Sequence, residues 1–422
     1  MKKDTYNIVV FNCQKSFIRV ILSVIKDNKI TYDVIHQIDN YETEFLGKSY
    51  WNVVHIFKEL KIGLKKAYEK CGYIDSVGVC TWGRDYGLIS NSDQLLSSPL
   101  CIKNNYGEIA LNRIGDEERK RLFNLSGIQC SKLNTLYQIA GYREKYPNIF
   151  NLADSILLIP DLIIYLFTGQ MGTEPSITGT TQYYDFNKTD YSSDILKRFN
   201  IPENKFPKII QNGEVRGFIR DEIALRLGIN SFPFICVASH NIASAIVSAP
   251  LEDDFIFINS DKYSLIGAEI ESPIISLDLY KKGFSNYIGA FNKINLLKEV
   301  PEINIIEKLK ACAEFIDDKS LFKSVYESIA EVYKKYIEEI EDITNKTYKN
   351  IYIVGNGAKD NALNEIIANK TGRNVIAGLY DATSIGNIAL QLSYFKDDFN
   401  INNIRSIIKN SVNIKTYKAK TD

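Results

Sequence analysis

Residues 237–245 read VASHNIASA and follow the run FPFIC at residues 232–236, in which only Pro233 interrupts the apolar residues. The apolar run predicts a buried strand over residues 232–237, and the alanine-rich stretch after it favours a helix. A strand that turns into a helix through small polar residues brings a few side chains to the mouth of an α/β sheet, where ligands tend to bind. His240, one of three histidines in the chain, lies at this turn. It is therefore either the backbone-bonded first residue of a structural helix or part of a binding site.

The composition of the 422-residue chain is typical of a globular protein of two or three domains. Basic and acidic side chains are equal in number, 51 of each, which gives no electrostatic argument for binding nucleic acid or a membrane surface. We expect neither a signal peptide nor a membrane-spanning segment, because no apolar run is long enough. The seven cysteines show no C-x-x-C spacing, which argues against a zinc site and a disulfide framework and predicts a cytoplasmic location.

Hydrophobic periodicity predicts strands and helices in alternation along the chain. A strand meander is expected near the start, and a helix, a strand and further helices follow it in the first half. Strands and helices alternate again after residue 255. The predicted strands cover residues 6–11, 17–25, 31–38, 74–79, 255–258, 350–354 and 374–377, and the predicted helices cover 51–68, 115–126, one from Tyr137, one from about 303, 321–344, 361–371 and 382–389.

Several motifs together resemble one protein family. VASHNIASA is similar to VASHDTASA, the central signature of the FGGY carbohydrate kinases in their rhamnulokinase form. Residues 80–88, CTWGRDYGL, resemble DTWGVDYGL of that family, and SGIQ at 126–129 and NTLYQ at 134–138 match it as they stand. The resemblance extends over about residues 6–395. It implies an α/β fold of two actin-like (ribonuclease H-like) domains with a central cleft, a sugar-side domain at 1–245 and a nucleotide-side domain at 246–422.

The resemblance also implies a set of sugar-binding residues. The family uses the glycine at the position of Gly83 to bring its backbone against the sugar. A neutral sugar needs hydrogen-bonding groups and an apolar face, which His240, Gln129 and Trp82 would supply. Lys103 stands where the family has the arginine of an Arg-Asp pair and keeps the charge, whereas the aspartate of that pair is replaced by Asn104.

The catalytic motifs depart from the family pattern. Asn241 replaces the aspartate that acts as catalytic base, and an amide has no usable basicity. In the first phosphate loop, Asn12 replaces an aspartate, and Gln14 and Ile18 replace glycines, whereas Arg19 is retained. Family members use ATP and Mg²⁺, and hard cations prefer charged oxygen ligands, which Asn12 does not provide.

The second phosphate motif departs in the same way. Asp261 and Lys262 replace the glycine and threonine that face the ATP phosphates, and a carboxylate there would repel phosphate oxygens. Gly355 and Gly357 are retained at the position of the adenine pocket. We therefore expect weak or absent binding of ATP and Mg²⁺, and the residues suggest no metal site of their own.

Three interpretations follow from these losses. The family reaction is ATP-dependent phosphorylation of a ketose such as L-rhamnulose, and the leading hypothesis is a homologue in which this activity is dead or severely impaired. Such a protein would bind a sugar, or a partner kinase, as a sensor or regulatory subunit, with homo-oligomers possible. The alternative is an active carbohydrate kinase with a rearranged site, in which Asp261 or Asp85 supplies the carboxylate. The third is a purely structural role.

Overall fold

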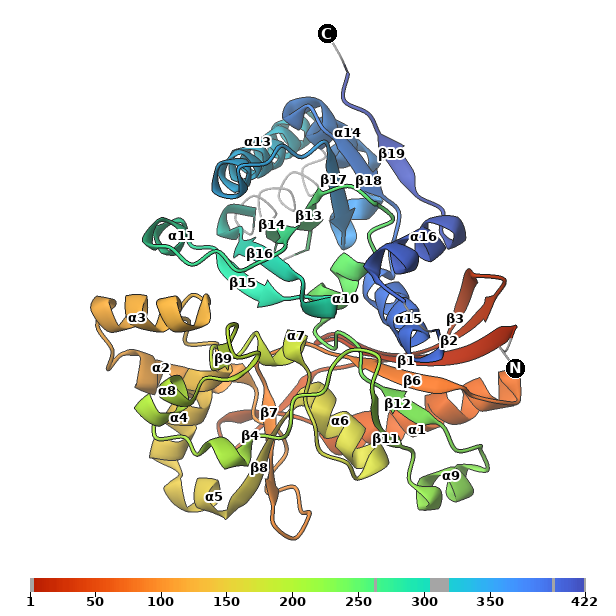
Figure 1. Cartoon of the computed structure of the whole chain (residues 1–422), viewed down its shortest axis with the longest axis vertical. Helices are drawn as coiled ribbons and strands as arrows, with labels where there is room; N and C mark the ends of the chain where they lie inside the picture. Colours follow the sequence, from red (N-terminus) through yellow and green to blue (C-terminus); the bar gives the residue numbers. More distant parts are fainter. Residues whose placement is uncertain (1–3, 262–263, 304–318, 397–398, 421–422) are drawn as a thin grey trace.

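The computed structural model describes residues 4–261, 264–303, 319–396 and 399–420, and it divides into two lobes (Figure 1). The N-terminal half of the chain builds the lower lobe in that view, and the C-terminal half builds the upper one. Each lobe contains one large sheet. The last strand of the N-terminal sheet ends at Ile235, and the first strand of the C-terminal sheet begins at Phe255. The short helix α10 (Asn241–Val247) comes between them in the sequence and lies between the lobes.

The N-terminal sheet has six strands in the order β11-β12-β6-β1-β2-β3. Strands β1, β2 and β3 form an antiparallel meander. Strand β6 runs parallel to β1, and β12 runs parallel to β6. Long apolar runs build β1 and β2, and their residues are almost all buried. The strands are β1 (Thr5–Cys13), β2 (Phe17–Lys26), β3 (Lys29–Asp39), β6 (Ser76–Cys80), β11 (Val215–Phe218) and β12 (Pro233–Ile235).

Helix α1 (Val53–Cys71) and helix α6 (Ile159–Thr168) cover one face of this sheet, where Phe11, Phe167 and Phe234 pack together. The other face carries α15 (Ala382–Phe395), a helix from the far end of the chain. A Cβ on Gly78 of β6 would be only 2.3 Å from the amide oxygen of Asn387 on α15, so helix and sheet approach closely here. The packing of α15 on the N-terminal sheet therefore joins the two lobes.

The rest of the N-terminal lobe consists of small elements around this sheet. They form three two-stranded sheets, β4-β5, β7-β8 and β9-β10, together with a helical cluster and several turns. They are β4 (Glu42–Phe45), β5 (Lys48–Trp51), β7 (Tyr86–Ser90), η1 (Ile102–Asn104), α2 (Tyr106–Leu111), α3 (Asp116–Ser126), α4 (Thr135–Lys145), α5 (Pro147–Leu152), β8 (Ala153–Leu158), α7 (Pro175–Thr178), β9 (Tyr184–Asp185), β10 (Asp190–Tyr191), α8 (Ser193–Arg198), η2 (Glu203–Lys205) and α9 (Asp221–Leu227).

The C-terminal sheet has seven strands in the order β15-β16-β14-β13-β17-β18-β19. Helix α13 packs on α14 over one face, and α16 lies beside α15 on the other side of the lobe. The elements are β13 (Phe255–Asn259), β14 (Leu265–Ile270), α11 (Leu277–Lys282), β15 (Ser285–Ile288), η3 (Ala290–Asn292), β16 (Ile294–Glu299), α13 (Lys319–Thr344), β17 (Asn350–Val354), η4 (Asn356–Lys359), α14 (Asn361–Thr371), β18 (Asn374–Ala377), α16 (Ile401–Ser411) and β19 (Lys415–Tyr417).

Most of the predicted elements are confirmed, with differences at their ends. The strand expected over residues 232–237 is only three residues long, Pro233–Ile235, and Pro233 has no N–H to donate at its start. The helix expected from residue 51 begins at Val53, because Asn52 caps it by accepting a hydrogen bond from the His55 N–H, and Trp51 ends strand β5. Most of the helix expected from about residue 303 lies outside the described residues.

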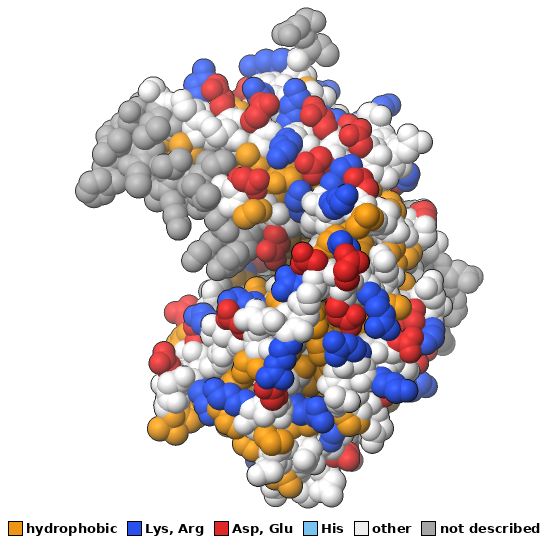
Figure 2. Space-filling model, turned by 90° about the vertical axis from the view of Figure 1, so that its left-hand side faces the viewer, with side chains coloured by type: hydrophobic (Ala, Val, Ile, Leu, Met, Phe, Trp, Pro, Cys, Tyr) orange, Lys and Arg blue, Asp and Glu red, His pale blue; other side chains and the backbone are white. Residues whose placement is uncertain are grey.

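Charged side chains of both signs are interspersed over the face drawn in Figure 2, with no region of a single sign. This distribution agrees with the equal numbers of acidic and basic residues in the sequence. None of the helices in the described parts of the chain is both long and apolar enough to cross a membrane.

Candidate functional site

Three side-chain amides form a continuous hydrogen-bonded row at the base of the interlobe region. The amide nitrogen of Asn241 donates to Oε1 of Gln14 at 2.7 Å, and the amide nitrogen of Gln14 donates to Oδ1 of Asn12 at 2.9 Å. The amide nitrogen of Asn12 then donates to the hydroxyl of Ser384 on α15 at 2.8 Å. The structure thus brings together the two positions that the sequence identified as catalytic, and a glutamine connects them.

The backbone holds this row in place from both sides of the N-terminal sheet. Asn12 lies near the end of β1, and Gln14 begins the turn to β2, where its N–H donates to the carbonyl of Phe17 at 2.8 Å. Asn241 begins α10, and its N–H donates to the carbonyl of Thr81 at 3.1 Å. Its side-chain Oδ1 is buried and has no hydrogen-bond partner among the described residues. A hydrogen-bond donor from a ligand or a water molecule would satisfy this oxygen.

Gly83 and the ring of His240, the residue before Asn241, lie against each other. A Cβ atom on Gly83 would be 3.1 Å from the Thr180 hydroxyl and 3.3 Å from Cδ2 of the His240 ring, so glycine allows a close approach here. Burial, and then the nearby positive charge of Arg84, lower the pKa of His240 to about 3. The ring is therefore neutral at pH 7 and offers one donor and one acceptor.

Trp82 packs inward instead of facing an open surface. It is 5% exposed, its ring centre is 4.4 Å from that of Trp51, and both indole N–H groups donate to Oδ2 of Asp85 at 2.8 Å. The other oxygen of Asp85 accepts the Ile102 N–H at 2.9 Å. Burial raises the pKa of Asp85, while these donors act in the opposite direction. Three donors thus occupy the carboxylate that the alternative interpretation offered as a base.

Gln129 and Lys103 are directed to partners other than the His240 ring. The Gln129 side chain donates to the carbonyls of Tyr280 at 2.9 Å and Phe284 at 3.1 Å, which joins the N-terminal lobe to the C-terminal one. Lys103 is 65% exposed and forms an ion pair with Glu42. The structure therefore brings Gly83, His240 and Asn241 together and places these two side chains in other contacts.

On the nucleotide side, protein side chains fill the space that two glycines leave. Oδ1 of Asp261 accepts the N–H of Asn356 at 2.9 Å, and a Cβ on Gly355 would be only 2.7 Å from the other carboxylate oxygen. Gly357 lies in the same way against the side chain of Ser260. Lys262, the second substituted residue of this motif, lies outside the described residues.

Arg19 reaches across to the C-terminal lobe. Its guanidinium forms an ion pair with Asp381 at 2.9 Å and donates to Gln37 at 2.7 Å. Because both partners are already in place, Arg19 acts as a link between the sheet and the start of α15.

The residues present do not fit ATP and Mg²⁺ in the way the family pattern requires. The first loop presents the neutral amides of Asn12 and Gln14 in place of a carboxylate and a glycine. In the second loop the carboxylate of Asp261 accepts the Asn356 N–H, which is then not free for a phosphate. In the described parts of the chain, no group of three or more His, Cys, Asp or Glu side chains could hold a metal ion.

Two residues near His240 were not identified from the sequence. Glu174 is 1% exposed and caps α7, and it also accepts from the N–H and the hydroxyl of Ser239, so it fixes the turn that carries His240. Its position before Pro175 is a helix-start signal that sequence reasoning could have used. Arg84, noted in the sequence only as a replacement for valine, has a positive φ of 82° and lies near the His240 ring.

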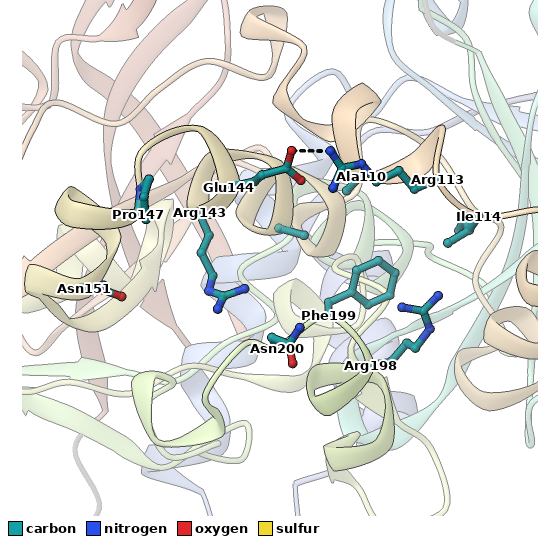
Figure 3. A pocket seen from close by; sticks show the side chains of 11 residues that line it. Ala110, Arg113, Ile114, Arg143, Glu144, Pro147, Asn151, Arg198, Phe199 and Asn200 are labelled. Atoms are coloured by element: carbon teal, nitrogen blue, oxygen red, sulfur yellow. Dashed lines mark hydrogen bonds and ion pairs between the residues drawn. The ribbon is translucent and has the colours of Figure 1, made fainter.

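A hollow that His240 does not line lies on the N-terminal lobe between α2, α4, α5 and α8. Its volume is about 390 Å³, and Arg113, Arg143 and Arg198 surround it with Phe199 and Asn200 (Figure 3). Arg113 is paired with Glu144, and Arg198 with Glu118 outside the hollow. These arginines lie at or just beyond helix ends, where positive charge is favourable because of the helix dipole.

Comparison with known proteins identifies the family. The N-terminal domain model of the FGGY family of carbohydrate kinases matches residues 7–247, and the C-terminal domain model matches residues 306–394. A rhamnulokinase from Oceanobacillus iheyensis is 28% identical over 454 residues, which cover 96% of each chain. A rhamnulokinase from Bacteroides thetaiotaomicron is 25% identical and covers 94% of this chain and 93% of its own length.

Solved structures of this family share the fold. The ligand-bound xylulose kinase from Lactobacillus acidophilus has a TM-score of 0.84 at 14% identity, covering 98% of this chain and 94% of its own. Plasmodium falciparum glycerol kinase with ADP has a TM-score of 0.84 at 13% identity, covering 99% and 95%. The predicted two-domain α/β fold is thereby confirmed. Because the N-terminal family model alone matches more than half of its length, the chain belongs to the FGGY family of carbohydrate kinases.

Proposed function

We propose that this chain is a rhamnulokinase-like protein that binds a sugar beside His240 but has lost, or almost lost, phosphoryl transfer. The family implies ATP-dependent phosphorylation of a sugar, and the curated relatives named above are rhamnulokinases. The proposed role is that of a sugar sensor or regulatory subunit, in a cytoplasmic setting, acting as a homo-oligomer or with a partner kinase.

The row of amides from Asn241 to Ser384 is the observation that carries this proposal. Phosphoryl transfer to a hydroxyl needs a group that accepts the proton of the attacking oxygen, and an amide cannot do so at neutral pH. Gln14 also bridges Asn241 and Asn12 directly, at 2.7 Å and 2.9 Å, so its side chain occupies the space between the two positions. The chain therefore lacks the catalytic base at position 241, and the side chain of Gln14 fills the first phosphate loop beside it.

Nucleotide binding is expected to be weak or absent for the same reason. Phosphate loops work by presenting backbone N–H groups to phosphate oxygens, often at glycines. Here the Asn356 N–H is bound to Asp261, whose negative charge opposes a phosphate at close range.

The sugar side keeps the groups that a neutral ligand needs. Asn241 has a buried oxygen without a hydrogen-bond partner among the described residues, the neutral His240 ring can donate and accept, and Gly83 lies against that ring. A sugar hydroxyl could satisfy the Asn241 oxygen without any metal or base. Sugar binding therefore survives as a function even where phosphoryl transfer does not.

Two measurements on the purified protein test this proposal. A coupled assay of ADP formation with a panel of ketoses, including L-rhamnulose, is expected to give no turnover above background. A thermal-shift scan of the same ketoses without nucleotide is expected to raise the melting temperature of the parent and not that of His240→Ala. Turnover within tenfold of an ordinary sugar kinase would contradict the loss of activity. If no ketose stabilises the parent, neutral-sugar binding is excluded.

A further inference from the structure

We propose that the ligand bound beside His240 is an anionic sugar, with Arg84 binding its carboxylate or phosphate group. This inference rests on the proposed sugar-binding function and adds the charge class of the ligand. Arg84 stands one residue after Gly83 and one before Asp85, in the segment that pairs with the His240 turn through Thr81.

The backbone of Arg84 is in an unfavourable conformation that its surroundings maintain. A φ of 82° is rare for a residue with a side chain and persists only where the surroundings enforce it. The Thr135 hydroxyl donates to the Arg84 carbonyl at 3.0 Å, and three donors hold the next residue, Asp85. Strain of this kind concentrates at functional sites, and here the strained residue carries a charged side chain that lies 3.6 Å from Glu299 of the C-terminal lobe.

The guanidinium of Arg84 has donors that the protein does not use. Among the described residues it makes no hydrogen bond, and its one ion-pair partner is Oε1 of Glu299 at 3.6 Å, beyond a good hydrogen-bond distance. The Arg84 side chain is only 20% exposed, whereas that of Glu299 is 64% exposed and free to turn toward solvent. A planar carboxylate or a phosphate can accept two of these N–H groups at once.

The position of this guanidinium matches the sugar site. Its charge is close enough to act on the His240 ring, which burial already keeps neutral, so the ring itself offers no charge to an anion. The ring, Gly83 and the Asn241 oxygen are then left for hydroxyl groups, and Arg84 for the charged end of the same ligand. Glu299, on the C-terminal lobe, competes with such a ligand and would turn away when it binds.

Calorimetry with three ligands of the same six-carbon skeleton tests this inference. The probes are neutral L-rhamnulose, L-rhamnonate and L-rhamnulose 1-phosphate, of which the last two separate a carboxylate from a phosphate. The parent is expected to bind at least one of the two anions at least tenfold more tightly than L-rhamnulose. Arg84→Gly, which also relieves the positive φ, should lose that tenfold preference for the anion over L-rhamnulose. Arg84→Lys should keep part of the preference, and Glu299→Gln should increase it severalfold.

The arginine-lined hollow of Figure 3 supplies the matched control. Arg143→Gln removes a guanidinium from that hollow and is expected to leave the affinities for all three ligands unchanged. Equal affinity of the parent for all three ligands, an unchanged preference in Arg84→Gly, or loss of anion binding in Arg143→Gln would each overturn the inference. If L-rhamnulose binds but neither anion binds more tightly, sugar binding stands and the anionic-ligand inference fails. If no probe binds at all, both fail.

Discussion

The side-chain nitrogen of Asn241 lies 2.7 Å from Oε1 of Gln14, although the two residues are 227 positions apart in the sequence. From Gln14 the row of amides continues through Asn12 to the hydroxyl of Ser384. A serine hydroxyl can donate as well as accept. The row can therefore reverse direction if each amide turns over, and it does not depend on an amide at position 241.

Asn241→Asp alone is expected to restore no kinase activity. The new carboxylate can only accept, so Gln14 turns its NH₂ group toward it and the row reverses as far as Ser384. Gln14 still fills the first loop, and the free energy of unfolding should change by less than about 1 kcal/mol. The coupled ADP assay and urea unfolding measure the two quantities.

A combined variant gives the comparison for this prediction. In Asn12→Asp/Gln14→Gly/Asn241→Asp, both carboxylates return and the glutamine is removed from the loop. Kinase activity recovered by Asn241→Asp alone, at the level of this combined variant or above, would show that Gln14 does not obstruct the site.

The sequence predicted the fold well because its signals are local or shared by a whole family. Apolar runs such as those of β1 and β2 predict buried strands directly from their residue types. The family motifs around Gly83 and His240 identified two residues that are in contact in the structure. The surroundings of Trp82 and Gln129 could not be predicted in this way. Trp82 shares the Asp85 carboxylate with Trp51, and Gln129 bonds to the other lobe. Such partners depend on how distant segments pack, which no local pattern encodes.

Asp261→Gly should strengthen nucleotide binding. It removes the carboxylate that holds the Asn356 N–H and lies against Gly355, so both charge repulsion and filled space disappear. Isothermal calorimetry with Mg-ATP is expected to show no measurable heat for the parent and at least tenfold tighter binding for the variant. Asp261→Asn keeps the size and removes the charge, and so separates the two causes. Micromolar affinity of the parent for Mg-ATP would contradict the prediction.

Asp85→Asn is expected to destabilise the protein and change its fluorescence. The two tryptophans of the chain, Trp51 and Trp82, both donate to Oδ2 of Asp85, so tryptophan emission reports on this one carboxylate. The NH₂ group of an asparagine would face either the two indole N–H groups or the Ile102 N–H, and in both orientations buried donors oppose one another. The expected loss is about 2 kcal/mol, with a shifted emission maximum. Unchanged stability and emission would mean that solvent replaces these hydrogen bonds.

His240→Gln should remove part of the loss of stability at acidic pH. Burial and Arg84 lower the pKa of His240 to about 3 in the folded protein, against an ordinary value of 6.5. Between these values the unfolded chain binds a proton that the folded protein does not, so stability falls as the pH drops below about 6.5. At pH 5 this contribution is about 2 kcal/mol, and glutamine does not have it.

Denaturant unfolding of parent and variant without ligand, at pH 7.5 and pH 5, checks this linkage. The difference in unfolding free energy between parent and His240→Gln should shift by about 2 kcal/mol between the two pH values, to the disadvantage of the parent at pH 5. In an Arg84→Gly background the shift should be smaller but still present, because burial is the larger of the two causes. Parallel pH dependences of parent and variant would mean that the His240 ring is open to solvent and protonates in the folded protein, and the neutral ring assigned to sugar hydroxyls would then be wrong.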